Sequence, residues 1–326
     1  MLKAVDVMMD EMGSAGVFAD GLMLAYGSRF TYDRWDGHTV EIDPKSKTLQ
    51  QKFASVHLLS QDAILEYCRK ITSKGGAVIV DSGPGTLTFA RTAHCAAYAL
   101  ETGVVNSGMW LHLSPSPTAL PWPAWHPKER IYQNILQKLR LGLLWYDYYC
   151  RVGGSSIFSR FYPITVEEIH SGLVKGRERL VTCLPGVYGW PGDRDLHFVE
   201  LSDARGVLVP HRFLTTADAS GVRTQLTLGN DEIAVLRKIP VTVESEAPVN
   251  MIVQQYDGTG IRLVLHAHGG IRIVVRDGDF RVQPGVTYHV HGDTPQSAVA
   301  DATRIVSFRI PLNGQVSLEI QAAGRP

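Results

Sequence analysis

The chain has 326 residues, of which 44% are hydrophobic and 20% charged, and its 32 basic residues balance 32 acidic ones. This length suffices for two domains, because one hydrophobic core rarely serves more than about 250–300 residues. The balanced charge gives no electrostatic basis for binding nucleic acid or an anionic membrane surface, and no apolar run approaches the roughly 18 residues that span a bilayer.

The N-terminal stretch MLKAVDVMMDEMG predicts an amphipathic helix and lacks the apolar core and cleavage site of a signal peptide. The four cysteines, Cys68, Cys95, Cys150 and Cys183, are far apart and show no CxxC spacing. We therefore expect buried thiols rather than a disulfide framework or a zinc site. A reducing compartment, cytoplasmic by default, is the corresponding expectation.

Strands and helices alternate over the first half of the chain. Apolar runs predict strands at 17–20, 77–81, 109–113 and 141–146, and 3.6-residue spacing predicts helices at 60–72, 87–100 and 128–140. Continuous apolar strands separated by helices indicate a parallel sheet covered on both faces. Four βα units in about 150 residues match half of a (β/α)8 barrel of the TIM type.

Half a barrel leaves three explanations open. The first half of the barrel is absent from this chain, the fold is a smaller α/β sheet, or two half-barrels associate. We expect the first, because no strand is predicted before Val17. An open parallel sheet leaves its edge strands unpaired, so we also expect association with another copy or another chain.

From about Arg179 the pattern changes to short strands, such as IRLVLHAH and IRIVVRD, separated by turn sequences such as DGTG and RDGD. Many of these strands alternate apolar and polar residues, as half-buried antiparallel strands do. We predict an antiparallel β-sandwich of about ten strands over residues 179–326, after a partial (β/α) barrel over residues 1–178. A capping-box pattern at Thr165–Glu168 predicts the start of a helix before this boundary.

Two acids end predicted strands of the first half. Asp20 and Asp81 follow different strands and are expected at the same edge of the parallel sheet. Cleavage of a glycosidic bond generally uses two carboxylates, so this pair is the candidate catalytic site. Asp147, after the fourth strand, is a third candidate. The structural alternative is that each acid caps a helix or forms a salt bridge.

The loops after these strands are rich in aromatic and polar side chains. Flat rings stack on the apolar faces of sugars, while polar neighbours bind hydroxyl groups. We therefore predict a carbohydrate-binding cleft formed by Tyr26, Tyr32, Trp35, Asp36, His38, Trp110, His112 and Tyr146. The alternative is that the rings, above all Trp122 and Trp125 among prolines, only cover the barrel rim.

Two His-x-His pairs occur in the second half, His266/His268 and His289/His291. Side chains at i and i+2 of a strand share one face, so each pair supplies two of the ligands that a metal needs. The segment GDFRVQPGVTYH resembles the second motif of cupins, but the glutamate of the first cupin motif does not follow the first pair. We expect histidines on the surface or bracing turns, with no metal site and no cofactor.

Four segments carry a family resemblance: FTYDRWDGHTVEID, the apolar strand with DSGPGT, PITVEEIHSGLVKGRERLVT and PGVYGWPGDRDLHFVELSDARG. They resemble an uncharacterised group of glycoside-hydrolase-like (β/α)-barrel proteins with a C-terminal β-sandwich. The resemblance implies that Asp20, Tyr32, Trp35, Asp36 and His38 line a cleft. The chain departs from that group at Gly21, where the family tends to have a glutamate, and at Asp81, where it tends to have an amide.

These patterns predict a carbohydrate-active protein of glycoside-hydrolase type that cleaves O-glycosidic bonds of an oligo- or polysaccharide with Asp20 and Asp81. The alternative is a non-catalytic carbohydrate-binding or interaction module that kept the aromatic cleft and lost the acid at position 21. A metal-dependent enzyme that uses the histidine pairs is a third hypothesis.

Overall fold

The computed structural model describes residues 2–20, 22, 30–81, 85–92, 95–99, 118–122, 128–147, 160–209, 212–293 and 295–323. The chain divides into two compact units, which are described separately. The N-terminal unit comprises Met1–His126 and Leu143–Arg151, and the C-terminal unit comprises Pro127–Gly142 and Val152–Pro326.

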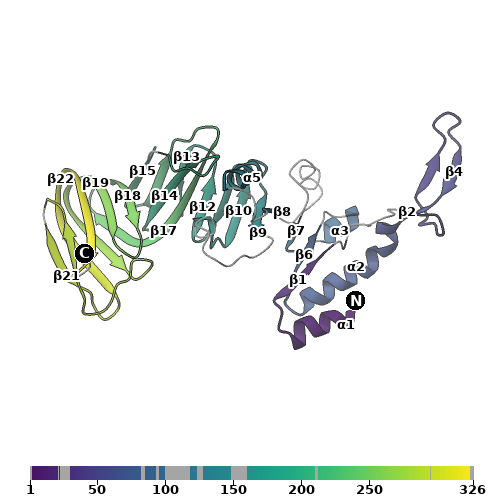
Figure 1. The fold of residues 1–326 in the computed structure, drawn as a ribbon, viewed down its shortest axis with the longest axis horizontal. Helices are drawn as coiled ribbons and strands as arrows, with labels where there is room; N and C mark the ends of the chain where they lie inside the picture. The colour runs from purple at the N-terminus through teal and green to yellow at the C-terminus, as the bar shows by residue number, and fades with distance from the viewer. Residues whose placement is uncertain are drawn as a thin grey trace. The chain divides into compact units, whose positions relative to one another are not determined.

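The N-terminal unit is built on a five-stranded parallel sheet in which the strands follow one another in chain order (Figure 1). Its strands are β1 (Gly16–Ala19), β6 (Ala77–Asp81), β7 (Ala97–Ala99), β8 (Thr118–Trp122) and β9 (Leu144–Asp147). Its helices are α1 (Leu2–Asp6), the π-helix η1 (Val7–Glu11), α2 (Val56–Ser73) and α3 (Leu87–Thr92).

The core of this unit lies between α2 and the start of the sheet. The helix buries Ile64, Cys68 and Ile71, which recur at helical spacing, and packs them with Val78 and Val80 of β6. Lys70 fixes α1 to α2 through an ion pair with Asp6 at 2.5 Å. The predicted helix at 60–72 and the predicted strand at 77–81 are thus confirmed, since α2 and β6 occupy these positions.

Two short antiparallel pairs lie between β1 and α2 in the sequence. β2 (Phe30–Thr31) pairs with β5 (Ala54–Ser55), and β3 (Val40–Ile42) pairs with β4 (Leu49–Lys52) to form a hairpin. In Figure 1 this hairpin projects away from α2.

The C-terminal unit contains the helix α5 (Lys128–Arg140) and thirteen strands in one antiparallel sheet. The strands are β10 (Val166–His170), β11 (Leu173–Gly176), β12 (Arg179–Thr182), β13 (Gly186–Gly189), β14 (Asp195–Asp203), β15 (Phe213–Asp218), β16 (Gly221–Leu226), β17 (Glu232–Ser245), β18 (Val249–Tyr256), β19 (Ile261–Arg276), β20 (Thr287–His291), β21 (Gln296–Val299) and β22 (Ile305–Ala322).

Two long strands keep this sheet continuous. β17 pairs with β12 and β14 over its first part and with β19 near its end. β19 pairs with β18 over its first half and with β17 over its second half, while β22 follows its other edge throughout. The sheet encloses two apolar cores, a larger one around Leu263, Ile273 and Phe308 and a smaller one around Leu236 and Trp190.

The predicted partial (β/α)8 barrel followed by a β-sandwich is wrong. Of the described residues 49% lie in strands and only 18% in helices, and the antiparallel sheet of the C-terminal unit dominates. The alternation of strand and helix that a barrel needs is not kept: the expected helix at 87–100 ends at Thr92, and residues 97–99 form β7. The expected sandwich is instead one hydrogen-bonded sheet, because β17 and β19 change partners along their length.

Three further local predictions have different outcomes. The expected helix at 128–140 is confirmed as α5, although it belongs to the C-terminal unit. The expected helix start at Thr165–Glu168 is wrong, because Val166–His170 is the strand β10, which pairs with β11. The expected strand at 109–113 lies outside the described residues.

Candidate functional site

Residues 30–55 form a small β-structure that leads into α2. Phe30 pairs with Ser55 where the segment begins and ends. Between these two residues the chain extends into the β3–β4 hairpin, in which Val40 pairs with Lys52. The loop of residues 32–39 is therefore held between two strand pairs.

Asp36 organises this loop. Its Oδ1 accepts the backbone N–H groups of His38 at 2.8 Å and Thr39 at 2.7 Å, the pattern of a turn closed by an aspartate side chain. Its Oδ2 accepts the Thr39 hydroxyl at 2.5 Å and the backbone N–H of Ser55 at 2.7 Å. Gly37 supplies the φ of 88° that this turn requires. One carboxylate thus joins the loop to β5.

These hydrogen bonds also decide the charge of Asp36. Removal from water would by itself raise the pKa of the carboxyl group. Four hydrogen bonds outweigh this effect of desolvation and hold the pKa of Asp36 well below its usual range. They come from the Thr39 hydroxyl and from the backbone N–H groups of Ser55, Thr39 and His38. Asp36 is therefore a fixed anion, and all four of its hydrogen bonds are made to the segment that contains it.

Four aromatic rings lie around this loop, and we call them the aromatic cluster: Phe30, Tyr32, Trp35 and Phe53. The Phe53 ring lies 5.0 Å from that of Phe30 and 5.6 Å from that of Tyr32, centroid to centroid. Phe30, Tyr32 and Trp35 keep 43%, 59% and 46% of their surface exposed. Exposed aromatic surface of this extent on one short segment is typical of a binding surface rather than of a core.

Trp35 is fixed in position although it is exposed. Its indole Nε1 donates a hydrogen bond to the Thr39 carbonyl at 3.0 Å. The Lys52 ammonium lies 4.2 Å from the centre of its ring, within the range of a cation–π interaction. A ring held in one orientation loses little conformational entropy when a ligand stacks on it.

The predicted catalytic acids lie at neighbouring strand ends. Asp20 follows β1, in which Ala19 pairs with Val80, and Asp81 follows Val80 as the last residue of β6. Asp20 is exposed. The parallel register thus brings the two backbone positions to the same level of adjacent strands, about 4.8 Å apart. The side chain of Asp81 lies outside the described residues.

Other predicted site residues fall largely outside the described part of the chain. This is the case for Tyr26, Trp110 and His112, and for the side chain of Tyr146 in β9. His38 is described and exposed, and its backbone N–H belongs to the Asp36 turn. Residues 30–55 therefore contain every predicted sugar-binding side chain that the structure describes.

The histidine pairs form no metal site in the described residues, where no group of three His, Cys, Asp or Glu side chains is placed to hold an ion. The rings within each pair lie 6.1 Å apart. His268 contacts the Asn313 side chain at 3.1 Å, and His289 contacts the Ser297 hydroxyl at 2.7 Å. These partners come from neighbouring strands, so the histidines link strands of the sheet.

The cysteines that the structure describes are buried thiols, as expected: Cys68, Cys95 and Cys183 form no disulfide among the described residues. A hydrogen bond with Cys95 and burial raise the pKa of Cys68, so its reactive thiolate form is disfavoured. Cys150 lies outside the described residues.

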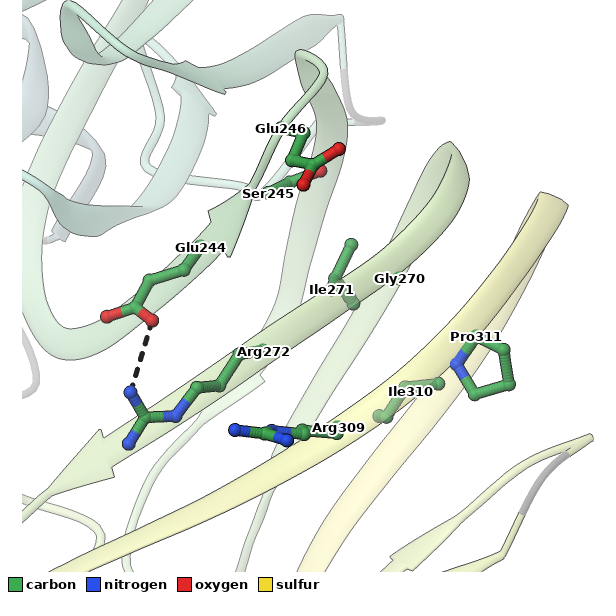
Figure 2. A pocket seen from close by; sticks show the side chains of 9 residues that line it. All are labelled: Glu244, Ser245, Glu246, Gly270, Ile271, Arg272, Arg309, Ile310 and Pro311. Carbon is green, nitrogen blue, oxygen red and sulfur yellow. Dashed lines mark hydrogen bonds and ion pairs between the residues drawn. The ribbon is translucent and has the colours of Figure 1, made fainter.

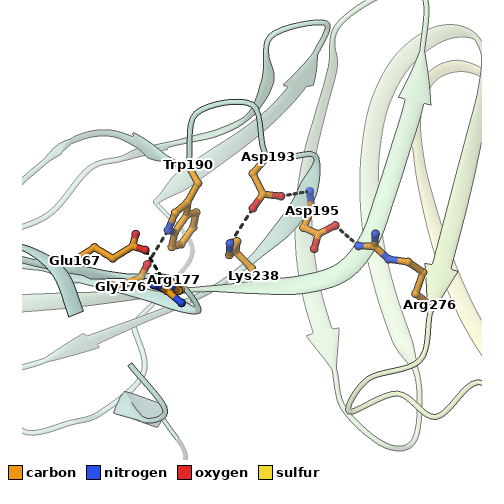
Figure 3. Close-up of polar contacts among 8 residues, drawn as sticks. All are labelled: Glu167, Gly176, Arg177, Trp190, Asp193, Asp195, Lys238 and Arg276. Carbon is orange, nitrogen blue, oxygen red and sulfur yellow. Dashed lines mark hydrogen bonds and ion pairs between the residues drawn. The ribbon is translucent and has the colours of Figure 1, made fainter. Parts of the chain in front are cut away.

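The segment PGVYGWPGDRDLHF, on which part of the family resemblance depends, builds an internal brace of the C-terminal unit (Figure 3). Trp190 is 8% exposed, and its Nε1 donates to the Gly176 carbonyl at 2.7 Å. Asp193 binds Lys238 at 2.8 Å, and Asp195 forms an ion pair with Arg276. The unusual composition of this segment is thus explained by structure, because its polar groups are used within the fold.

His197 packs beside Trp190, with their ring centres 5.2 Å apart, and is fully buried. Its Nδ1 contacts the Thr224 hydroxyl at 2.8 Å, and its Nε2 has no hydrogen-bond partner among the described residues. Burial lowers the pKa of His197 to about 4, only partly offset by Asp193. The imidazole is therefore neutral at pH 7 and inaccessible to a ligand.

Lys138 is a buried charge-bearing residue that the sequence analysis did not identify. It is 2% exposed, and desolvation lowers its pKa to about 7. The burial of Lys138 could have been predicted from the sequence. It lies three residues after Ile135 and seven after Ile131, and this helical spacing places it on the buried face of α5.

Comparison with known proteins adds no assignment, since no protein-family model matches the chain and a search of curated proteins returned no match. Among the described residues, no helix combines the length and the apolar character needed to cross a bilayer.

We predict that Asp36→Asn loosens the loop of residues 32–39. An amide nitrogen cannot accept the bonds that Asp36 Oδ2 receives, so the Ser55 N–H and the Thr39 hydroxyl lose their partner. Hydrogen exchange measured by mass spectrometry should become faster in peptides from residues 30–55. Asp33→Asn, in the same loop, is the matched control and should leave exchange unchanged. Equal protection in both variants would contradict the role of Asp36.

We predict that His197 makes the protein less stable in acid. The pKa of His197 is about 4 in the fold, against 6.5 for an unperturbed histidine, so between these pH values the unfolded chain binds a proton that the fold does not. Acidification from pH 7 to pH 4 should therefore cost about 3 kcal/mol of unfolding free energy through this group.

Urea unfolding at the two pH values checks this, with His197→Gln as the non-titrating variant and exposed His38→Gln as the control. The loss on acidification should be smaller by this amount in His197→Gln only. An unchanged loss would show that His197 does not titrate as described.

Proposed function

We propose that this chain binds carbohydrate through the aromatic cluster of residues 30–55. The observation that carries the proposal is the exposure of Tyr32 and Trp35 on a segment that Asp36 holds in place. Sugar rings present apolar C–H faces, and exposed aromatic side chains stack on them. The fixed Asp36 turn and the Trp35–Thr39 bond support this reading, because a preorganised surface loses less entropy on binding.

The polar groups beside the rings fit such a ligand. The Lys52 ammonium lies over the Trp35 ring and supplies hydrogen-bond donors to a hydroxyl group at its edge. His38 is exposed two residues beyond Asp36. An apolar platform with a few polar groups at its border is the usual composition of a site for a small polar ligand.

Neutral polysaccharides test this proposal, because they separate stacking from charge. We expect the protein to be retarded in native gels that contain at least one of a panel of glucans, xylans and mannans. Trp35→Ala should weaken that retardation at least tenfold in apparent affinity, since truncating a central aromatic contact costs about 2 kcal/mol or more. Leu49→Ala removes an exposed apolar side chain, 52% exposed, from the same hairpin and should bind as the unaltered protein does.

No retardation by any polysaccharide, or equal retardation of Trp35→Ala, would remove the carbohydrate proposal. Circular dichroism of both variants shows whether the fold is kept. Trp35 is exposed, so its replacement should leave the spectrum unchanged.

A second candidate function is hydrolysis of the glycosidic bond. It is favoured by the register of β1 and β6, which brings Asp20 and Asp81 to adjacent strand ends. A retaining mechanism needs carboxyl groups about 5–5.5 Å apart and an inverting one about 6.5–9.5 Å. Neighbouring strand ends allow either separation, with one carboxyl group as acid and the other as nucleophile or base.

We expect release of reducing sugar from the bound polysaccharide if this pair is catalytic. Asp20→Asn and Asp81→Asn should each lower the rate by about 10²–10⁴-fold while binding in the native gel is kept. Asp62→Asn, an exposed acid on α2, serves as the matched control. Hydrolysis that survives both substitutions would exclude the pair, and binding without hydrolysis would leave the chain a binding module.

A further inference from the structure

A groove crosses the sheet of the C-terminal unit where β17, β19 and β22 run side by side (Figure 2). Its volume is about 550 Å³, within the range of small-molecule sites. All residues that line it belong to this unit and to these three strands or the turn after β17. The groove is therefore independent of the carbohydrate proposal, which rests on residues 30–55.

Missing side chains explain why the sheet is hollow at this place. A Cβ atom added to Gly269 or Gly270 would meet no atom within 4 Å, so open space lies above both residues. Pro311 pairs with Gly270 on the neighbouring strand and keeps its short ring at the rim. The floor of the groove is thus backbone and apolar surface, while longer side chains stand at its ends.

One end of the groove is positively charged. Arg272 and Arg309 are direct partners in the register of β19 and β22, which brings two like charges to one level of adjacent strands. Like charges directly opposite each other destabilise a sheet. Glu244 of β17 binds Arg272 at 3.2 Å, but Arg309 has no ion pair among the described residues. Figure 2 shows both guanidinium groups at the same end of the groove.

The charges suit an anion with a single negative charge. Arg272 and Arg309 together carry two positive charges and Glu244 one negative charge, which leaves one positive charge at this end. Glu246 lies at the opposite end, beside Ser245 (Figure 2). Its carboxylate is an acceptor for the hydroxyl groups of a ligand. The second negative charge of a dianionic phosphate would be repelled by Glu246. A carboxylate carries a single negative charge, and its two oxygens match the planar fork of the Arg309 guanidinium.

We propose that this groove binds a small hydroxy-carboxylate. Its carboxylate pairs with Arg309 and the edge of Arg272, its hydroxyl groups donate to Glu246, and its carbon skeleton lies over Gly270 and Pro311. The bound anion separates the two opposed arginines and so offsets the like-charge repulsion that the register imposes. Neither this site nor its ligand class requires that residues 30–55 bind sugar.

Titration of the ¹⁵N-labelled full chain, followed by NMR, tests the site with three probes: D-glucuronate, D-glucose as its neutral counterpart, and inorganic phosphate. We expect saturable shifts with D-glucuronate, concentrated at the amides of residues 270–272 and 309, and none with D-glucose at the same concentrations. Arg309→Gln should weaken D-glucuronate binding at least tenfold. Arg281→Gln removes the same charge from the same unit outside the groove and should bind normally.

Three outcomes would overturn the proposal: no saturable shift with D-glucuronate, equal affinity of Arg309→Gln, or tighter binding of phosphate than of D-glucuronate. Arg309 is exposed, so Arg309→Gln should fold, and its unchanged amide spectrum outside the groove checks this. The polysaccharide gels provide an independent readout. Arg309→Gln should be retarded there as the unaltered chain is, so failure of one proposal leaves the other intact.

Discussion

The hydrogen-bond ladder along β19 is the constraint on which the C-terminal unit depends. Its sixteen residues pair with β22 from Ile261 to Arg276, while the opposite edge pairs with β18 and then with β17. Buried backbone N–H and C=O groups must be paired, so a strand that serves two neighbours in turn joins them into one sheet. This change of partners takes place around Gly269 and Gly270, the two glycines above which the groove is open, and Arg272 and Arg309 stand at one end of that groove.

Local periodicity predicted the elements that depend on local contacts, and failed where distant pairing decides. The apolar spacing of α2 and α5 is visible in the sequence because each helix buries one face. The segment Thr165–Glu168 has the pattern of a helix start, yet Ser171 and Gly172 turn the chain so that β11 pairs with β10. The continuous sheet could not be predicted for the same reason, because a short stretch of sequence does not show that β19 pairs with three other strands.

In the candidate site too, features set by the local sequence could be predicted and features set by distant contacts could not. Composition alone pointed to Tyr32 and Trp35, because aromatic residues in a polar, glycine-containing loop have no apolar periodicity that would bury them. The role of Asp36 could not be predicted, since its bond to the Ser55 N–H joins residues nineteen positions apart. His197 is a similar case: its burial follows from its place within β14 and from Thr224 of β16, and a single histidine in a sequence carries no sign of either.

The acidic residues of β10 have a consequence for solubility. β10 stands at one end of the strand path of the large sheet, and among the described residues it pairs with β11 alone. Glu167 and Glu168 are both exposed there and pair with Arg177 and His170 at 3.0 Å and 2.8 Å. Charge on an outermost strand discourages the docking of a foreign strand, which is how many sheet proteins avoid fibril formation. The segment predicted as a helix start thus places charged side chains on an end strand of the sheet, where they oppose aggregation through strand pairing.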